Sequence, residues 1–177
     1  MKVKRSRTKK FRLTDNKKEV CGITLYQIES LIDFGDIHAG DKGGWVEKEE
    51  NLSQCGDAWV FGNAKVYGNA WVLDNAEVFG NAWVSGDAKV FGNAEVYGNA
   101  NMHDAADILW ISRVGSRLGT TTAFKNKDGG ISIACGCFYG TLAEFAEKVK
   151  ETHHNNKFAK EYNLLIELIK EHFEVEE

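Results

Sequence analysis

Several features that this 177-residue sequence lacks narrow the classes of protein it can belong to. No apolar run is long enough to cross a membrane, which excludes a membrane-spanning protein. The basic start is followed by further polar residues, so we expect no signal peptide and a cytoplasmic location. Proline is absent, and the four cysteines fit reduced thiols better than a disulfide framework. No Walker motif and no recognised nucleic-acid-binding motif is present.

Charge is distributed unevenly along the chain. Residues 1–18 hold nine lysines and arginines against Asp15 alone, a local net charge of +8, so the remainder of a chain with net charge −4 carries −12. A basic arm on an acidic body can bind nucleic acid or an acidic partner. Without a nucleic-acid motif beside it, we favour a solvated terminus for residues 1–18.

Residues 56–109 form nine uninterrupted hexads. Their sequences are GDAWVF, GNAKVY, GNAWVL, DNAEVF, GNAWVS, GDAKVF, GNAEVY, GNANMH and DAADIL. In each hexad the alanine and the valine two residues later face the same side of an extended segment and point into a narrow core. The Gly-Asn and Gly-Asp pairs suit sharp corners. A fixed period of six predicts a parallel β-helix with 18 residues per coil and three coils.

This pattern resembles the left-handed β-helix of hexapeptide-repeat proteins, in which an aliphatic residue and a small residue recur at fixed places. The left-handed crossover is implied by that resemblance. The preceding segment, "DFGDIHAGDKGGWVEKEENLSQCGDAWVFGNA", is similar to the start of YdcK-type hexapeptide proteins, which are labelled transferases. The predicted fold is therefore mainly β: a short left-handed parallel β-helix of about three coils, followed by a small α+β domain.

We divide the chain into a basic arm (1–18), an N-terminal cap with a first degenerate repeat (19–55), the β-helix (56–112) and a C-terminal α+β domain (113–177). A first strand is expected near Lys10 to Leu13, or disorder, and a second strand between Val20 and Leu31. Trp45 and Val46 are expected to plug the open coil end, because exposed core and unpaired strand edges need a cover. Leu52 is placed in register with the alanines.

The C-terminal domain is predicted as a β-hairpin and two helices. The hairpin has strands at 120–124 and 131–137 around a turn at 126–130. The first helix begins at Thr141, with Glu144 completing a capping box, and the second runs from about Lys157 to Phe173. The segments "GSRLGTTTAF", "CGCFYGTLAEF" and "KFAKEY" resemble an uncharacterised domain of proteins from Gram-positive bacteria and their phages.

Outward-facing residues 18 apart are expected to stack in columns along the β-helix. Two columns are apolar, and a contiguous apolar surface indicates a partner surface. The predicted interface residues are Phe61, Phe79 and Tyr97 in one column and Leu73, Phe91 and Leu109 in the other. Either the C-terminal part of the same chain or neighbouring subunits of a homo-oligomer, a trimer or dimer, are expected to cover them.

The sequence offers one weak candidate for a catalytic base and one for a metal site. Hexapeptide acyltransferases use a histidine to deprotonate the acceptor, and His103 is a weak candidate because no long loop interrupts the coils to form a pocket. Cys135 and Cys137 supply two of the four ligands that zinc usually needs, so we expect no metal and no cofactor. Alternation is expected to place both cysteines on one side of their strand, under the helices.

The segment "GSRLGTTT" is the favoured ligand site. It combines a guanidinium, several hydroxyls and backbone amides next to two glycines, which is the chemistry of anion recognition. The candidate ligand-binding residues are Ser116, Arg117, Thr120, Thr121 and Thr122. The competing interpretation is an arginine that bridges the two subdomains and threonines that favour a strand.

Three functions follow. The favoured one is a non-enzymatic binding protein that acts on a host protein or a small phosphorylated ligand, and the phage-like C-terminal segments suggest a counter-defence role. The alternatives are a hexapeptide-class acyltransferase and a self-assembling structural protein.

Overall fold

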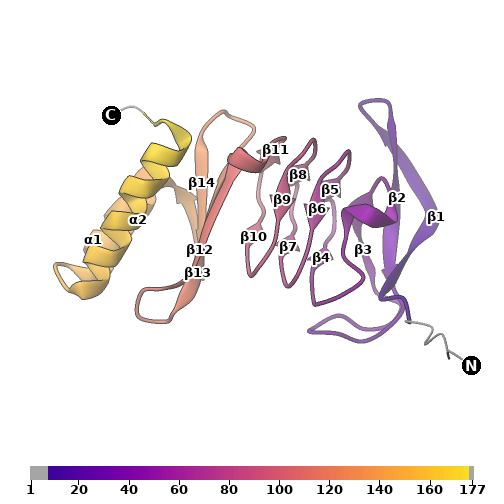
Figure 1. The fold of residues 1–177 in the computed structure, drawn as a ribbon, viewed down its shortest axis with the longest axis horizontal. Coiled ribbons are helices and arrows are strands. Elements are labelled where there is room, and N and C mark those ends of the chain that lie inside the picture. The colour runs from indigo at the N-terminus through magenta and orange to yellow at the C-terminus, as the bar shows by residue number, and fades with distance from the viewer. Residues whose placement is uncertain (1–7, 176–177) are drawn as a thin grey trace, which may run out of the picture.

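The computed structural model describes residues 8–175 and shows a mainly β chain. Along its length lie, in order, an N-terminal hairpin, a stack of β-helix coils, a four-stranded sheet and two helices at the far end (Figure 1). The described part of the chain contains no helix that is both long and apolar enough to cross a membrane.

The coils have the predicted hexad geometry. Each of the first eight hexads contributes a two-residue strand: β4 (Trp59–Val60), β5 (Lys65–Val66), β6 (Trp71–Val72), β7 (Glu77–Val78), β8 (Trp83–Val84), β9 (Lys89–Val90), β10 (Glu95–Val96) and β11 (Asn101–Met102). Each strand pairs in parallel with the strand 18 residues away, as Val60 does with Val78. The alanines and valines from Ala58 to Val96 are fully buried. The inward and outward assignment is confirmed for these repeats.

At the N-terminal end, one face of the β-helix is extended by further strands. Strands β1 (Phe11–Val20), β2 (Ile23–Ser30) and β3 (Lys42–Val46) join β5, β8 and β11 in one six-stranded sheet, with β3 parallel to β5. The first predicted strand is confirmed as part of β1. Of the basic segment, residues 1–7 lie outside the described range.

The cap differs from the prediction in two details. A short 3₁₀ turn, η1 (Glu49–Asn51), precedes Leu52. Leu52 pairs with Val72, 20 residues later, so it stacks on the valines and not on the alanines as predicted. The corner between Leu52 and Val60 is two residues longer than a hexad corner, which shifts the register. Val46 is buried as expected, but Trp45 faces outward beside Lys65. Phe11 and Ile28 join the core at this end, whereas Trp59 points outward in register with Glu77 and is buried against the rings of Phe11 at 6.2 Å and Phe34 at 5.4 Å.

The β-helix ends one hexad earlier than the sequence pattern suggests. After Met102 the chain forms a 3₁₀ turn, η2 (Ala105–Asp107), because the Asp107 carboxylate accepts the backbone N–H groups of His103 and Asp104 at 2.8 and 2.9 Å. Ile108 then begins an antiparallel strand, β12 (Ile108–Val114). Leu109 therefore does not continue the column of Leu73 and Phe91, and it packs under the helices.

The C-terminal sheet has the order β12, β13 (Gly119–Lys125), β14 (Ile131–Cys135) and β15 (Phe138–Thr141). Phe124 and Ala134 on one face complete the core of the β-helix, whereas Ala123 and Ile133 on the other face pack against the helices. The return strand ends at Cys135, because a turn with Gly136 at φ +57° follows, so Cys137 is exposed and not buried as predicted.

Both predicted helices are confirmed. Helix α1 (Leu142–His153) is capped by Thr141, whose hydroxyl accepts the Glu144 N–H, and Glu144 completes the capping box. Helix α2 (Lys157–Phe173) is capped by the Asn156 side chain. The helices cover the face of the sheet that points away from the coils (Figure 1).

Candidate functional site

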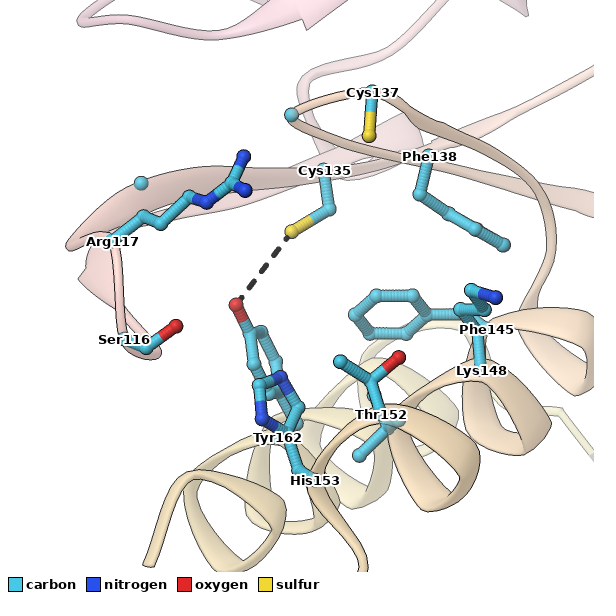
Figure 2. A pocket seen from close by; sticks show the side chains of 13 residues that line it. Ser116, Arg117, Cys135, Cys137, Phe138, Phe145, Lys148, Thr152, His153 and Tyr162 are labelled. Atoms are coloured by element: carbon cyan, nitrogen blue, oxygen red, sulfur yellow. Dashed lines mark hydrogen bonds between the residues drawn. The ribbon is translucent and has the colours of Figure 1, made fainter.

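A cavity of 370 Å³ lies between the C-terminal sheet and the two helices. The loop that joins β12 to β13 and the turn that joins β14 to β15 form its upper side, and α1 with Tyr162 of α2 forms its lower side (Figure 2). Cavities that bind small molecules typically occupy about 300–1,000 Å³. The cavity is therefore large enough for a small ligand.

The loop at the cavity mouth is held against α2 by close packing. The Gly115 N–H donates to Glu161 Oε2 at 3.1 Å. Gly115 has a φ of +75°, and a Cβ at this position would lie 2.1 Å from the Tyr162 hydroxyl. Only glycine allows this approach. As a result, Ser116 and Arg117 are fixed at the rim of the cavity.

The lower wall is aromatic. The rings of Phe145 and Tyr162 meet edge to face at 5.6 Å, and the His153 ring stacks on Tyr162 at 5.4 Å. Burial, and secondarily the neighbouring Cys135, raises the pKa of Tyr162 to about 12. Its hydroxyl therefore keeps its proton at neutral pH and remains a hydrogen-bond donor.

Three basic side chains surround this apolar wall. Arg117 lies on the sheet side, and Lys148 and His153 lie on the helix side (Figure 2). Within residues 8–175, Arg117 forms no ion pair, and Lys148 forms only an exposed pair with Glu151 at 3.4 Å. A guanidinium without a carboxylate partner can offer its planar fork to a phosphate or carboxylate. The arrangement suits an anionic ligand with an apolar portion.

The structure brings together only part of the predicted ligand-binding set. Ser116 and Arg117 line the cavity, but the three threonines do not. Because β13 alternates, the Thr121 hydroxyl donates to Cys135 Sγ at 3.2 Å on the helix side, while the Thr122 hydroxyl accepts the Glu95 N–H at 3.3 Å on the other side. The Thr120 hydroxyl bonds that of Ser112 at 2.9 Å. The threonines therefore connect strands.

His103 lies at the end of the last coil. Its exposed ring places Nδ1 2.5 Å from the buried Ser85 hydroxyl, and its backbone N–H is held by Asp107. No group of three or more potential metal ligands occurs within residues 8–175.

The apolar columns are partly covered by the chain itself. Phe79 stacks on Tyr97 at 4.4 Å, and Tyr97 meets Tyr139 of β15 at 4.7 Å. Phe61 packs edge to face on Phe79 at 6.3 Å. In the other column Trp110, and not Leu109, meets the Phe91 ring at 4.1 Å.

Sequence reasoning missed the helix-borne half of the cavity. Phe145, Val149 and His153 are four residues apart and share one helix face, and Lys148 follows Phe145 by three residues at the edge of that face. This spacing was available in the sequence. The contribution of Tyr162 was not, because it depends on how α2 packs against α1.

Comparison with known proteins gives one short match. The chain is 41% identical over 39 residues to a protein named uncharacterized acetyltransferase YdcK from Escherichia coli strain K12. The match covers 22% of this chain and 12% of YdcK. No family model matches the chain. Together with the coils, this similarity fits a hexapeptide-repeat β-helix, and it does not extend to the activity of the larger protein.

Proposed function

We propose that this chain is a non-enzymatic binding protein whose C-terminal cavity holds a small phosphorylated ligand. The observation that supports this most directly is the placement of Arg117 opposite Lys148 and His153 across the aromatic wall. The phosphate is bound by Arg117 and Lys148, and the rest of the ligand packs on Phe145 and Tyr162. The β-helix serves as a rigid support for the sheet that forms one side of the cavity.

Calorimetry with AMP and with pyrophosphate tests the proposal, because the two probes separate a requirement for the apolar portion from one for phosphate alone. We expect AMP to bind and Arg117→Gln to weaken binding at least about tenfold, since a hydrogen bond to a charged group contributes about 1.5–3 kcal/mol. Arg113→Gln is the matched control, because Arg113 is exposed on β12 and does not line the cavity. Equal loss in both variants, or no binding of either probe, would contradict the proposal.

An acyltransferase is the second candidate, favoured by the contact between His103 and Ser85 and by the name of the similar E. coli protein. In this alternative the imidazole acts as the base that deprotonates the acceptor. Acetyl-coenzyme A binding that is lost in His103→Ala would favour it over the binding protein. A counter-defence role, a host partner and homo-oligomerisation stay predictions.

A further inference from the structure

The outer faces of the β-helix differ in charge. On the face formed by β4, β7 and β10, Glu77 and Glu95 pair in register, and burial raises the pKa of both carboxyls. The face that contains β3, β5 and β8 carries no carboxylate at the equivalent positions, which are Trp45, Lys65 and Trp83. One face is therefore acidic, and another is basic and aromatic.

On the basic face, one line of side chains runs across neighbouring strands. Gln27, Trp45, Lys65, Trp83 and Asn101 are successive register partners on β2, β3, β5, β8 and β11. Because register partners share a face, these side chains lie next to one another across five strands.

Two further lysines join this line from outside the repeats. Lys18 Nζ lies 3.9 Å from the centre of the Trp45 ring, and Lys127 Nζ lies 4.9 Å from that of Trp83. Lys65 Nζ lies 5.1 Å from the Trp83 ring. We call these five residues, Lys18, Trp45, Lys65, Trp83 and Lys127, the Trp–Lys row.

Among the residues that the structure describes, the three lysines of the row have no carboxylate partner. Within the described residues none of them forms an ion pair; Lys65 Nζ donates to the Asn63 carbonyl at 3.0 Å and Lys127 Nζ to the Asn81 carbonyl at 3.5 Å. Burial and the nearby Lys65 lower the pKa of Lys18 to about 8, and burial and Lys127 lower that of Lys65. The ammonium groups are thus close enough to repel one another, and an anion laid along them relieves that repulsion.

We propose that the Trp–Lys row binds single-stranded nucleic acid, with the lysines on successive phosphates and the tryptophans beside the bases. Trp45 and Trp83 are both partly exposed, and a base that stacks on either ring takes the place of an ammonium that lies over it. Aromatic rings interleaved with cations are how proteins bind single strands without sequence preference. An acidic peptide would use only the lysines, and the paired bases of a duplex cannot stack on the rings. The line from Gln27 to Asn101, which contains Trp45, Lys65 and Trp83, spans four strand spacings or about 19 Å, enough for a few nucleotides.

Fluorescence anisotropy of a labelled 12-nucleotide oligo-dT, titrated with the full chain at several salt concentrations, tests this proposal. The double variant Lys65→Gln with Lys127→Gln is expected to bind at least about tenfold more weakly. The slope of log affinity against log salt should fall by about 1.4, since each phosphate contact on a single strand contributes about 0.7. Trp83→Leu should weaken binding with the salt slope unchanged.

The matched control is Lys89→Gln with Lys160→Gln, which removes the same charge from two exposed positions outside the row. This control should bind as the unaltered chain does, and circular dichroism should show all variants folded. Equal weakening in row and control variants would mean general electrostatic attraction and overturn the proposal. So would unchanged binding in the row variant, which would place any binding elsewhere, for example at residues 1–7. Tighter binding of a duplex or of a poly-glutamate peptide than of oligo-dT would also overturn it.

Discussion

The two ends of the β-helix are closed in different ways. At the N-terminal end the β1–β2 hairpin extends the edge of an existing sheet, and its residues Phe11 and Ile28 join the core of the β-helix. At the C-terminal end a separate four-stranded sheet covers the core with one face and carries the helices on the other. The N-terminal hairpin packs on the β-helix core alone, so no further element is built on it. The C-terminal sheet has two apolar faces, and the second face supports a second core with the helices. The cavity belongs to that second core.

The closures also satisfy polar groups differently. The buried Lys10 at the N-terminal end donates from Nζ to the carbonyls of Ala58 and Gly56 at 2.8 and 3.2 Å. The C-terminal end uses backbone and side-chain groups of the sheet, such as the Thr122 hydroxyl that accepts the Glu95 N–H. Free backbone groups at the coil ends are therefore satisfied differently: a long cationic side chain binds carbonyls at the N-terminal end, and a strand hydroxyl binds an N–H at the C-terminal end.

The largest effect should come from breaking the coil between the two closures, because both rest on it. Val78 is fully buried in the middle of the β-helix, and Val78→Asp would place a carboxylate in a core with no partner. We expect a loss of more than about 4 kcal/mol of unfolding free energy, enough to unfold a marginally stable chain. Thermal melts followed by circular dichroism measure this. Glu77→Ala, one residue away and outward, should be nearly silent; equal tolerance of both would contradict the core assignment.

A smaller effect should come from opening the C-terminal closure alone. Phe124 is fully buried in the β-helix core, and Phe124→Ala is expected to lower the unfolding free energy by about 3–5 kcal/mol through lost burial and the cavity left behind. Urea unfolding provides the measurement. Phe91→Ala is the control, since Phe91 is 38% exposed and should cost well under half as much. A similar cost for both would show that the sheet contributes little to closing the core.

The sequence predicts a region well when the interactions that fix its structure are between residues close together in the chain. The hexads fix their own strands and corners, so the coils from Ala58 to Met102 follow directly from the period of six. The two helices were equally predictable, because the Thr141–Glu144 capping box and the helical spacing of apolar residues are local signals. The two-residue register shift at Leu52 was missed because it depends on a longer corner that has no period.

The errors at the C-terminal end have the same origin. DAADIL fits the hexad pattern, yet Asp107 bonds the backbone of His103 and Asp104 and forms an ion pair with Lys125 at 2.7 Å, which favours a turn. Of the five predicted ligand-binding residues, Ser116 and Arg117 line the cavity, because they stand together in one loop. The helix side of the cavity is contributed by α1 and α2, whose packing against the sheet is a non-local property.

The smallest expected effect is a pH dependence of the unfolding free energy, which Lys10 of the N-terminal closure contributes. Burial lowers the pKa of Lys10 from 10.5 to about 8, although Asp57 acts in the opposite direction. Between these values the unfolded chain holds a proton that the folded chain has lost, so this lysine makes stability rise with pH from about 8 toward 10.5, by at most about 1.4 kcal/mol per pH unit. The test is urea unfolding of the unaltered chain and of Lys10→Met at pH 7.5 and at pH 9.5. From the lower to the higher pH, the unfolding free energy of the unaltered chain should rise relative to that of Lys10→Met. Lys18 shifts in the same direction but is present in both proteins, so its contribution cancels in the comparison.

The matched control for this pH test is Lys17→Met, which replaces an exposed lysine of the same strand. This variant should follow the unaltered chain across the pH range. A stability difference between the unaltered chain and Lys10→Met that does not change with pH would mean that Lys10 keeps its proton in the folded chain. In that case the carbonyls of Gly56 and Ala58 would hold an ammonium, and both closures would carry a buried charge, since the C-terminal one holds the Asp107 carboxylate against backbone N–H groups and Lys125.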